Sequence, residues 1–232
     1  MIMNTHWLFG ATSLTPSPSW EAYAERYSDL LRAITSGLPG ETTWVGHVDG
    51  LDDAPIDPDD RALLTKVLVD GRLRNDLGQL MEGAISHQWL VGRRNSPNGE
   101  HSVVLSGGWG SDEDLKVTVS LKVNEPGQLL WSYPDETIAE LFAAVLDAID
   151  GTRARIRDRL LHRLIVKRYN PSWEIGSHVY MSAPLDDPGK FPPEARQVPC
   201  GRGFLLIVPP GPTDDDTLAR MRWVAAAIGA TD

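Results

Sequence analysis

Residues 115 to 123 read Leu115-Lys116-Val117-Thr118-Val119-Ser120-Leu121-Lys122-Val123, and apolar residues alternate with polar ones along the whole stretch. A period of two is typical of a β-strand with one face on a core and the other toward water. Two stretches rich in β-forming residues precede it, Ile85 to Val91 and Ser102 to Ser106. Turn compositions separate the three, namely Asn95-Ser96-Pro97-Asn98-Gly99 and Gly107-Gly108-Trp109-Gly110-Ser111. The middle of the chain therefore predicts an antiparallel meander.

Helical patterns flank this meander on both sides. Four segments carry apolar residues at the 3.6-residue spacing of amphipathic helices, bounded by capping residues and terminal glycines: Trp20 to Ile34, Asp57 to Gly71, Pro134 to Gly151 and Thr213 to Gly229. In the second, Asp57 is the predicted cap and Pro58 the first helical residue. Further strands are predicted at Thr5 to Ala11, Thr43 to Val48 and Gly203 to Val208.

The segment from Arg153 to Arg168 has two interpretations. Its apolar residues Ile156, Leu160 and Leu164 have helical spacing, whereas Leu164-Ile165-Val166 equally suits a strand. We favour a helix. On a helix, Arg155, Arg159, Arg163 and Lys167 would form one basic ridge.

Helices mixed with an antiparallel meander predict the α+β class, with four to five helices packed on one antiparallel sheet. We expect one domain over residues 1–232, with a division into subdomains 1–125 and 126–232 as the alternative. The pattern leaves the strand order open.

Charge and composition restrict the classes of function. The 232 residues include 22 Lys and Arg against 32 Asp and Glu, a net charge of −10. This balance argues against a general nucleic-acid binder and against binding to an anionic membrane surface. The single cysteine, Cys200, excludes an intrachain disulfide framework. With no secretory signal and no apolar run near the ~20 residues of a membrane span, we expect a soluble, cytoplasmic protein.

A search for catalytic motifs finds none. There is no Gly-x-Ser-x-Gly elbow and no phosphate-binding loop, and Gly201-Arg202-Gly203 reads as a hairpin rather than a dinucleotide fingerprint. No two of the six histidines have metal-site spacing. We therefore expect no catalytic residues, no cofactor and no metal, and a protein that is not an enzyme. The alternative is a hydrolase whose site is assembled from dispersed His and Asp residues.

Two charged features remain. The first is acidic, with no basic residue among its members: Asp49, Asp52, Asp53, Asp57, Asp59 and Asp60. It is either a solvated loop with a capped helix start or a patch for a cationic partner. Asp112, Glu113 and Asp114 form a shorter acidic tip, and nearby Trp109 is a candidate exposed anchor.

The second feature is basic. The Arg153–Arg168 segment holds one acid, Asp158, among seven basic residues: Arg153, Arg155, Arg157, Arg159, Arg163, Lys167 and Arg168. It is either paired internally with neighbouring acids or an anion-binding face, and the latter makes a nucleic-acid-binding regulator a second alternative.

The order of several short motifs along the chain resembles the Immunity protein 52 family of bacterial polymorphic-toxin antidotes. In sequence these are Trp7-Leu8-Phe9-Gly10 before the Trp20 to Ile34 helix, Leu68-Val69-Asp70-Gly71-Arg72-Leu73-Arg74-Asn75-Asp76, Gln88-Trp89, Val103-Val104-Leu105-Ser106-Gly107-Gly108, Tyr169-Asn170-Pro171-Ser172-Trp173, and Gly201 to Val208 before an acidic-capped helix. Asn170 stands where the family has Asp, and Lys116-Val117-Thr118-Val119 departs from the family pattern.

The resemblance implies a cytoplasmic immunity protein. Such proteins bind the toxin domain of a secreted effector, commonly one delivered by a type VI secretion system, and this family is often paired with nuclease toxins of restriction-endonuclease type. It supplies no catalytic residues and no interface residues. A cationic nuclease groove would favour the acidic residues, or Trp109 with Asp112, Glu113 and Asp114, as the contact surface. We expect no direct contact with nucleic acid or membrane.

Overall fold

The computed structural model describes residues 5–13, 19–37, 41–46, 54–70, 77–79, 88–96, 99–108, 115–123, 133–158, 161, 175–185, 187 and 191–228. Its elements in chain order are β1 (Thr5–Ser13), α1 (Trp20–Gly37), β2 (Glu41–Gly46), β3 (Ala54–Ile56), α2 (Arg61–Asp70), β4 (Gln88–Ser96), β5 (Gly99–Gly108), β6 (Leu115–Val123), α3 (Asp135–Ala148), β7 (Gly151–Asp158), β8 (His178–Met181), β9 (Arg196–Cys200), β10 (Gly203–Ile207) and α5 (Asp214–Ala227). The predicted α+β class is confirmed.

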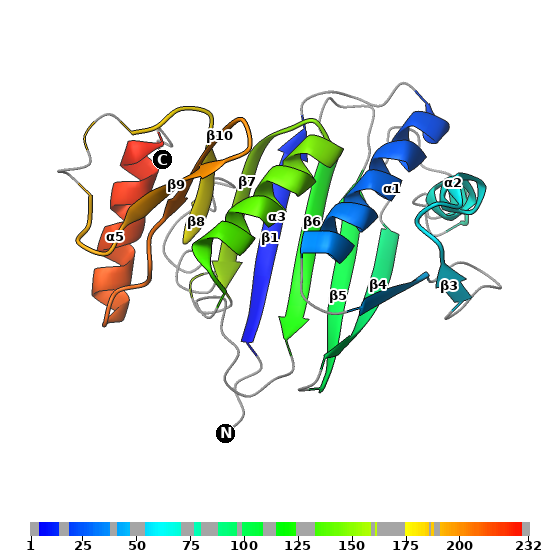
Figure 1. Ribbon diagram of the computed structural model, residues 1–232, viewed down its shortest axis with the longest axis horizontal. Coiled ribbons are helices and arrows are strands. Elements are labelled where there is room, and N and C mark those ends of the chain that lie inside the picture. Colours follow the sequence, from blue (N-terminus) through cyan, green and yellow to red (C-terminus); the bar gives the residue numbers. More distant parts are fainter. Residues whose placement is uncertain are drawn as a thin grey trace.

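These strands form one sheet in which each neighbouring pair is antiparallel, in the order β3-β2-β4-β5-β6-β1-β7-β8-β10-β9 (Figure 1). The predicted meander is confirmed as β4, β5 and β6, and β6 has the predicted bounds. At the centre, Phe9 of β1 pairs with Val119 of β6 on one side and with Ile156 of β7 on the other. The sheet is thus continuous between the strands before and after residue 125.

Helices α1 and α3 lie side by side over one face of this sheet, and α2 packs against α1 (Figure 1). The stripe predicted for α1 is buried, with Tyr23, Leu30 and Ile34 each no more than 1% exposed. The centre of this core is an edge-to-face contact between Phe9 of β1 and Phe142 of α3, with ring centroids 4.6 Å apart. Edge-to-face packing of this kind stabilises a core beyond the area that it buries.

Helix α5 covers the opposite face, at the β8–β10 end of the sheet. Along β10, Leu205 and Ile207 belong to the core under α1 and α3, whereas Leu206 packs in a second core with Met221 and Val224 of α5. Because successive strand residues point to opposite faces, helices on both faces account for the continuous apolar run of β10. The buried strand predicted there is confirmed.

Two predicted helix starts are confirmed by their hydrogen bonds. At α1, Ser19 Oγ accepts from the backbone N–H of Ala22 at 3.2 Å. At α5, Thr213 Oγ1 accepts from Asp216 N at 3.2 Å and donates to Asp216 Oδ2 at 2.6 Å. Thr213 is thus the N-cap of α5, and its hydroxyl satisfies one of the backbone donors that a helix start leaves unpaired.

The helix favoured for Arg153 to Arg168 is wrong for residues 153–158, whereas Leu161, further along the segment, is helical. Residues 151–158 form strand β7, between β1 and β8. The alternation explains why: Ala154 and Ile156 join the core under α3, while Arg155 and Arg157 lie on the other face. The basic ridge of a helix therefore does not form at Arg155. Apart from buried Leu161, residues 159–168 lie outside the described part.

Besides β7, three described strands were not predicted, namely β3, β8 and β9. Each spans only three to five residues. Periodicity over so few residues carries little signal, and these strands form by pairing with β2, β7 and β10, which the local sequence does not reveal. Two of them, β3 and β9, are the edges of the sheet, and each contains a proline (Pro55 and Pro199), a residue that strands tolerate at edges.

Candidate protein-binding surface

The structure describes three of the ten predicted contact residues. These are Asp57, Asp59 and Asp60, which lie in the turn between β3 and α2 and are all exposed. The other predicted residues lie outside the described part of the chain: Asp49, Asp52, Asp53, Trp109, Asp112, Glu113 and Asp114. We call residues 57–60 the acidic turn.

The acidic turn is organised by its own carboxylates. Asp57 Oδ1 accepts from the backbone N–H of Asp59 at 2.8 Å, and Asp60 Oδ1 accepts from the N–H of Leu63 at 2.9 Å. The second bond makes Asp60 the N-cap of α2, so the helix begins at Arg61 and the predicted start at Asp57-Pro58 is three residues too early. Both aspartates suit such bonds, but only the tertiary structure selects the one that starts the helix.

A buried serine anchors the turn to α1. Ser28 is fully buried, and its Oγ donates a 2.6 Å hydrogen bond to the carbonyl oxygen of Pro58. On the strand side, Ile56 is buried in the core directly before Asp57. The turn is thus fixed at both its strand end and its middle, and its carboxylates are presented to solvent from a defined backbone.

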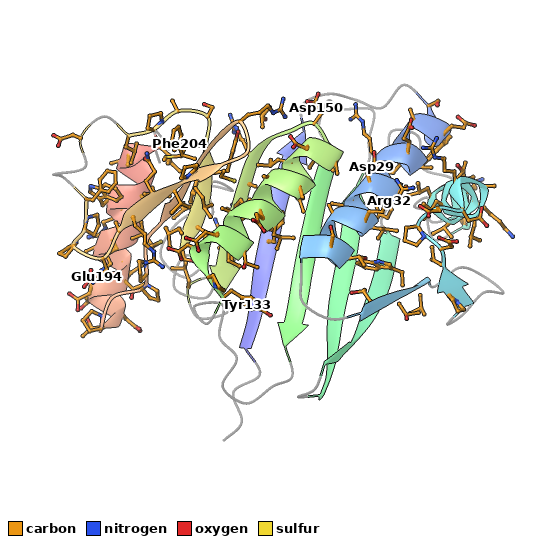
Figure 2. The ribbon with its side chains drawn as sticks, in the orientation of Figure 1. Asp29, Arg32, Tyr133, Asp150, Glu194 and Phe204 are labelled. Carbon is orange, nitrogen blue, oxygen red and sulfur yellow. The ribbon has the colours of Figure 1, made fainter. Side chains whose placement is uncertain are left out.

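Ion pairs connect the turn to α1. The Arg32 guanidinium pairs with Asp59 and also with Asp29, the latter at 2.9 Å. Asp29 and Arg32 lie on the side of α1 nearest α2 (Figure 2). The hydrogen bonds that Arg32 donates to Asp59 raise the pKa of Arg32. A third pair joins Arg61 to Glu25 at 3.1 Å.

These pairs leave a surplus of negative charge. We call the acidic turn and the four neighbouring residues of these ion pairs the acidic face, which contains five carboxylates around two guanidinium groups: Glu25, Asp29, Asp57, Asp59 and Asp60 around Arg32 and Arg61. Each of the paired side chains is about half exposed or more. Exposed pairs of this kind are weak and salt-sensitive, so a cationic partner can compete for the carboxylates at little cost.

The predicted basic segment does not offer a cationic surface at its described arginines 155 and 157. Arg157 is 3% exposed and Arg155 is 8% exposed. The Nε of Arg157 donates to the carbonyl oxygen of Ile175 at 2.5 Å, and burial lowers its pKa to about 10. Side chains buried in this way cannot contact phosphates, although Arg153, at the start of the strand, is exposed.

The one histidine whose side chain the structure describes is equally inaccessible. His178 is 2% exposed, and its Nδ1 lies 3.1 Å from Oγ of Ser177, itself fully buried. Burial lowers the pKa of His178 to about 3, against the opposing effect of the nearby Asp135 carboxylate. Asp135 instead pairs with Arg196 in two hydrogen bonds, which lower its pKa. The cluster joins α3, β8 and β9 and presents no substrate-accessible base.

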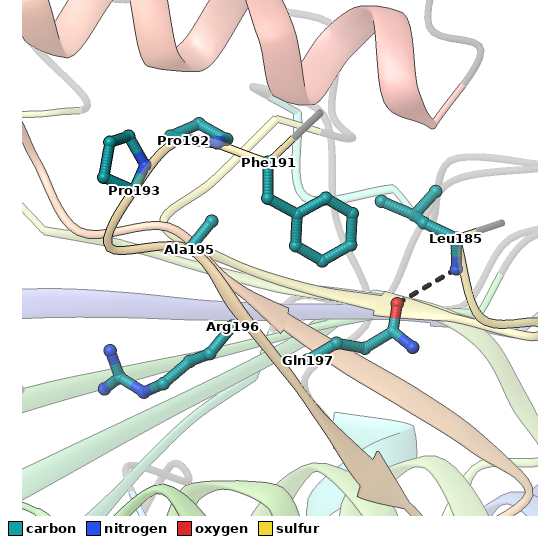
Figure 3. A pocket seen from close by; sticks show the side chains of 7 residues that line it. All are labelled: Leu185, Phe191, Pro192, Pro193, Ala195, Arg196 and Gln197. Atoms are coloured by element: carbon teal, nitrogen blue, oxygen red, sulfur yellow. Dashed lines mark hydrogen bonds between the residues drawn. The ribbon is translucent and has the colours of Figure 1, made fainter. Parts of the chain in front are cut away.

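A hollow that the sequence did not reveal lies beside the edge strand β9. Its volume is about 520 Å³, and it is lined by Leu185, Phe191, Pro192, Pro193, Ala195, Arg196 and Gln197 (Figure 3). Gln197 Oε1 accepts from the backbone N–H of Leu185 at 3.0 Å and closes one end. Phe191 packs on Trp223 of α5 with ring centroids 5.4 Å apart, and Glu194 pairs with Arg220 at 2.8 Å. Its walls come from loop residues and from the start of β9, and the sequence of these residues shows no periodic pattern that would predict a hollow.

The remaining candidate groups are structural. Cys200 is buried, its Sγ donates to the carbonyl oxygen of Ala139 at 3.2 Å, and burial raises its pKa to about 11. Within the described ranges, no group of three or more His, Cys, Asp or Glu residues is placed to hold a metal ion. Nor does any helix in those ranges have the length and apolar character needed to cross a bilayer.

No protein-family model matches this chain, and a search of curated proteins likewise finds no match.

Proposed function

We propose that this protein is an immunity protein that binds a cognate secreted toxin, a nuclease of restriction-endonuclease type, and blocks it by stoichiometric occlusion. The proposal rests on the motif order shared with the Immunity protein 52 family. The structural observation that supports it is the acidic turn, in which three exposed carboxylates are held on a fixed backbone. In this proposal the protein acts in the cytoplasm of the toxin-producing bacterium.

The charge of the acidic face suits such a partner. A nuclease must neutralise DNA phosphates, so its substrate groove is cationic. Carboxylates on an inhibitor can take the place of those phosphates and also accelerate the encounter. A preorganised backbone reduces the entropy lost on binding, because the turn does not have to be ordered at that moment.

The acidic turn would be one part of a larger interface. A standard interface buries about 800 Å² on each partner. The protein exposes 12334 Å², so the interface would use less than a tenth of its surface. We place the centre of this interface on the acidic turn. There, Asp57 and Asp60 accept hydrogen bonds from backbone N–H groups rather than from arginines.

Co-expression tests the function itself. The partner to use is the toxin domain encoded by the neighbouring reading frame, made with and without this protein. We expect restored growth and a one-to-one complex on co-purification. If this protein neither restores growth nor co-purifies with the toxin domain, the immunity function is wrong.

Substitutions that remove the charges of the acidic turn then test this surface separately from the function. The variant D57N/D59N/D60N removes three charges but keeps oxygen acceptors for the Asp59 and Leu63 N–H groups. The control E136Q/E140Q/D214N removes three exposed charges from α3 and α5 instead. We expect the first variant to bind at least roughly tenfold more weakly, with a smaller salt dependence, and the control to bind like wild type. Equal binding by both variants would exclude the acidic turn while the immunity function stands.

A further inference from the structure

We draw no further inference here: the strongest candidate, the hollow of about 520 Å³ between the edge strand β9 and the loop before it, carries nothing because nothing in the part of the chain that the structure describes shows what covers it.

Discussion

Arg157 of β7 donates a 2.5 Å hydrogen bond from Nε to the carbonyl oxygen of Ile175, eighteen residues further along the chain. Both residues are buried, Arg157 at 3% exposure and Ile175 at 7%. A buried carbonyl that loses its donor costs the full desolvation free energy of that group. The contact therefore joins β7 to the segment that leads into β8, on the face of the sheet opposite α3.

Replacing Arg157 by alanine should destabilise the protein by about 2–4 kcal/mol, because it removes the donor to Ile175 and the packing of the aliphatic stem. Arg153 lies on the same strand and the same face but is exposed, so R153A is the matched control and should change stability by less than about 0.5 kcal/mol. Urea unfolding followed by circular dichroism measures both. Equal effects would mean that the buried contact adds nothing to stability.

Acidification should destabilise the fold through His178. Its pKa is about 3 in the folded protein and about 6.5 when unfolded, so the unfolded chain binds an extra proton between these values. The contribution of His178 to the free energy of unfolding is therefore complete above pH 6.5. It is lost as the pH falls toward 3, at about 1.4 kcal/mol per pH unit.

H178Q does not titrate and retains a hydrogen-bonding side chain, so the comparison isolates this residue from the carboxylates. We expect the stability advantage of wild type over H178Q to shrink by about 2–3 kcal/mol between pH 6.5 and 4.5. Free energies of unfolding measured at several pH values for both proteins give the result. Parallel curves would contradict a depressed pKa for His178.

The cap of α2 predicts a contrast between two substitutions at one position. D60A removes the acceptor for the Leu63 N–H and should cost about 1 kcal/mol, whereas D60N keeps an equivalent acceptor and should cost only a few tenths. Thermal unfolding of the two variants measures the difference. If D60N is as unstable as D60A, charge rather than capping explains the role of Asp60.

Gly203 should not tolerate a side chain. A Cβ at this position would collide with the backbone carbonyl of Met181 and with the ring of Tyr180 on the neighbouring strand. A carbonyl in a paired strand has little freedom to move, so we expect G203A to cost about 1–3 kcal/mol.

Arg202 provides the control for this substitution. It is the exposed neighbour in the same hairpin, and its ion pairs with Asp147 and Asp150 are long, at 3.6 and 3.8 Å. R202A should therefore be nearly neutral in the same denaturation assay.

Features with local causes were predictable. The stripe of α1, the Ser19 and Thr213 caps and the alternation of β6 each depend on residues within a few positions of one another. The start of α2 marks the limit of such signals. Asp57 and Asp60 are both good caps, and the anchoring of Pro58 by Ser28, thirty residues earlier, favours a turn at 57–60 and a helix from Arg61.

The candidate site was predictable only where it depends on residues that are close together in the sequence. Clustered aspartates are visible in the sequence, but the Arg32 that pairs with Asp59 comes from another helix, and the hollow beside β9 is assembled from a loop and an edge strand. No periodic pattern in the sequence predicts either the ion pair between Arg32 and Asp59 or the hollow. The burial of Arg155 and Arg157 was likewise hidden, because charged residues at alternate positions ordinarily indicate a solvated face.

By itself, the sequence determined four helices, the meander, the caps at Ser19 and Thr213 and the excess of acidic charge, because these follow from side-chain chemistry repeated at short spacing. Only the tertiary structure decided that residues 151–158 are a strand between β1 and β8, that two arginines lie buried, and which aspartates remain exposed. The physical reason is that strand pairing and burial depend on partners distant in the chain. Those partners determine whether a segment is more stable as a helix or as a strand, and whether its side chains are buried. A pattern within the segment carries no information about them.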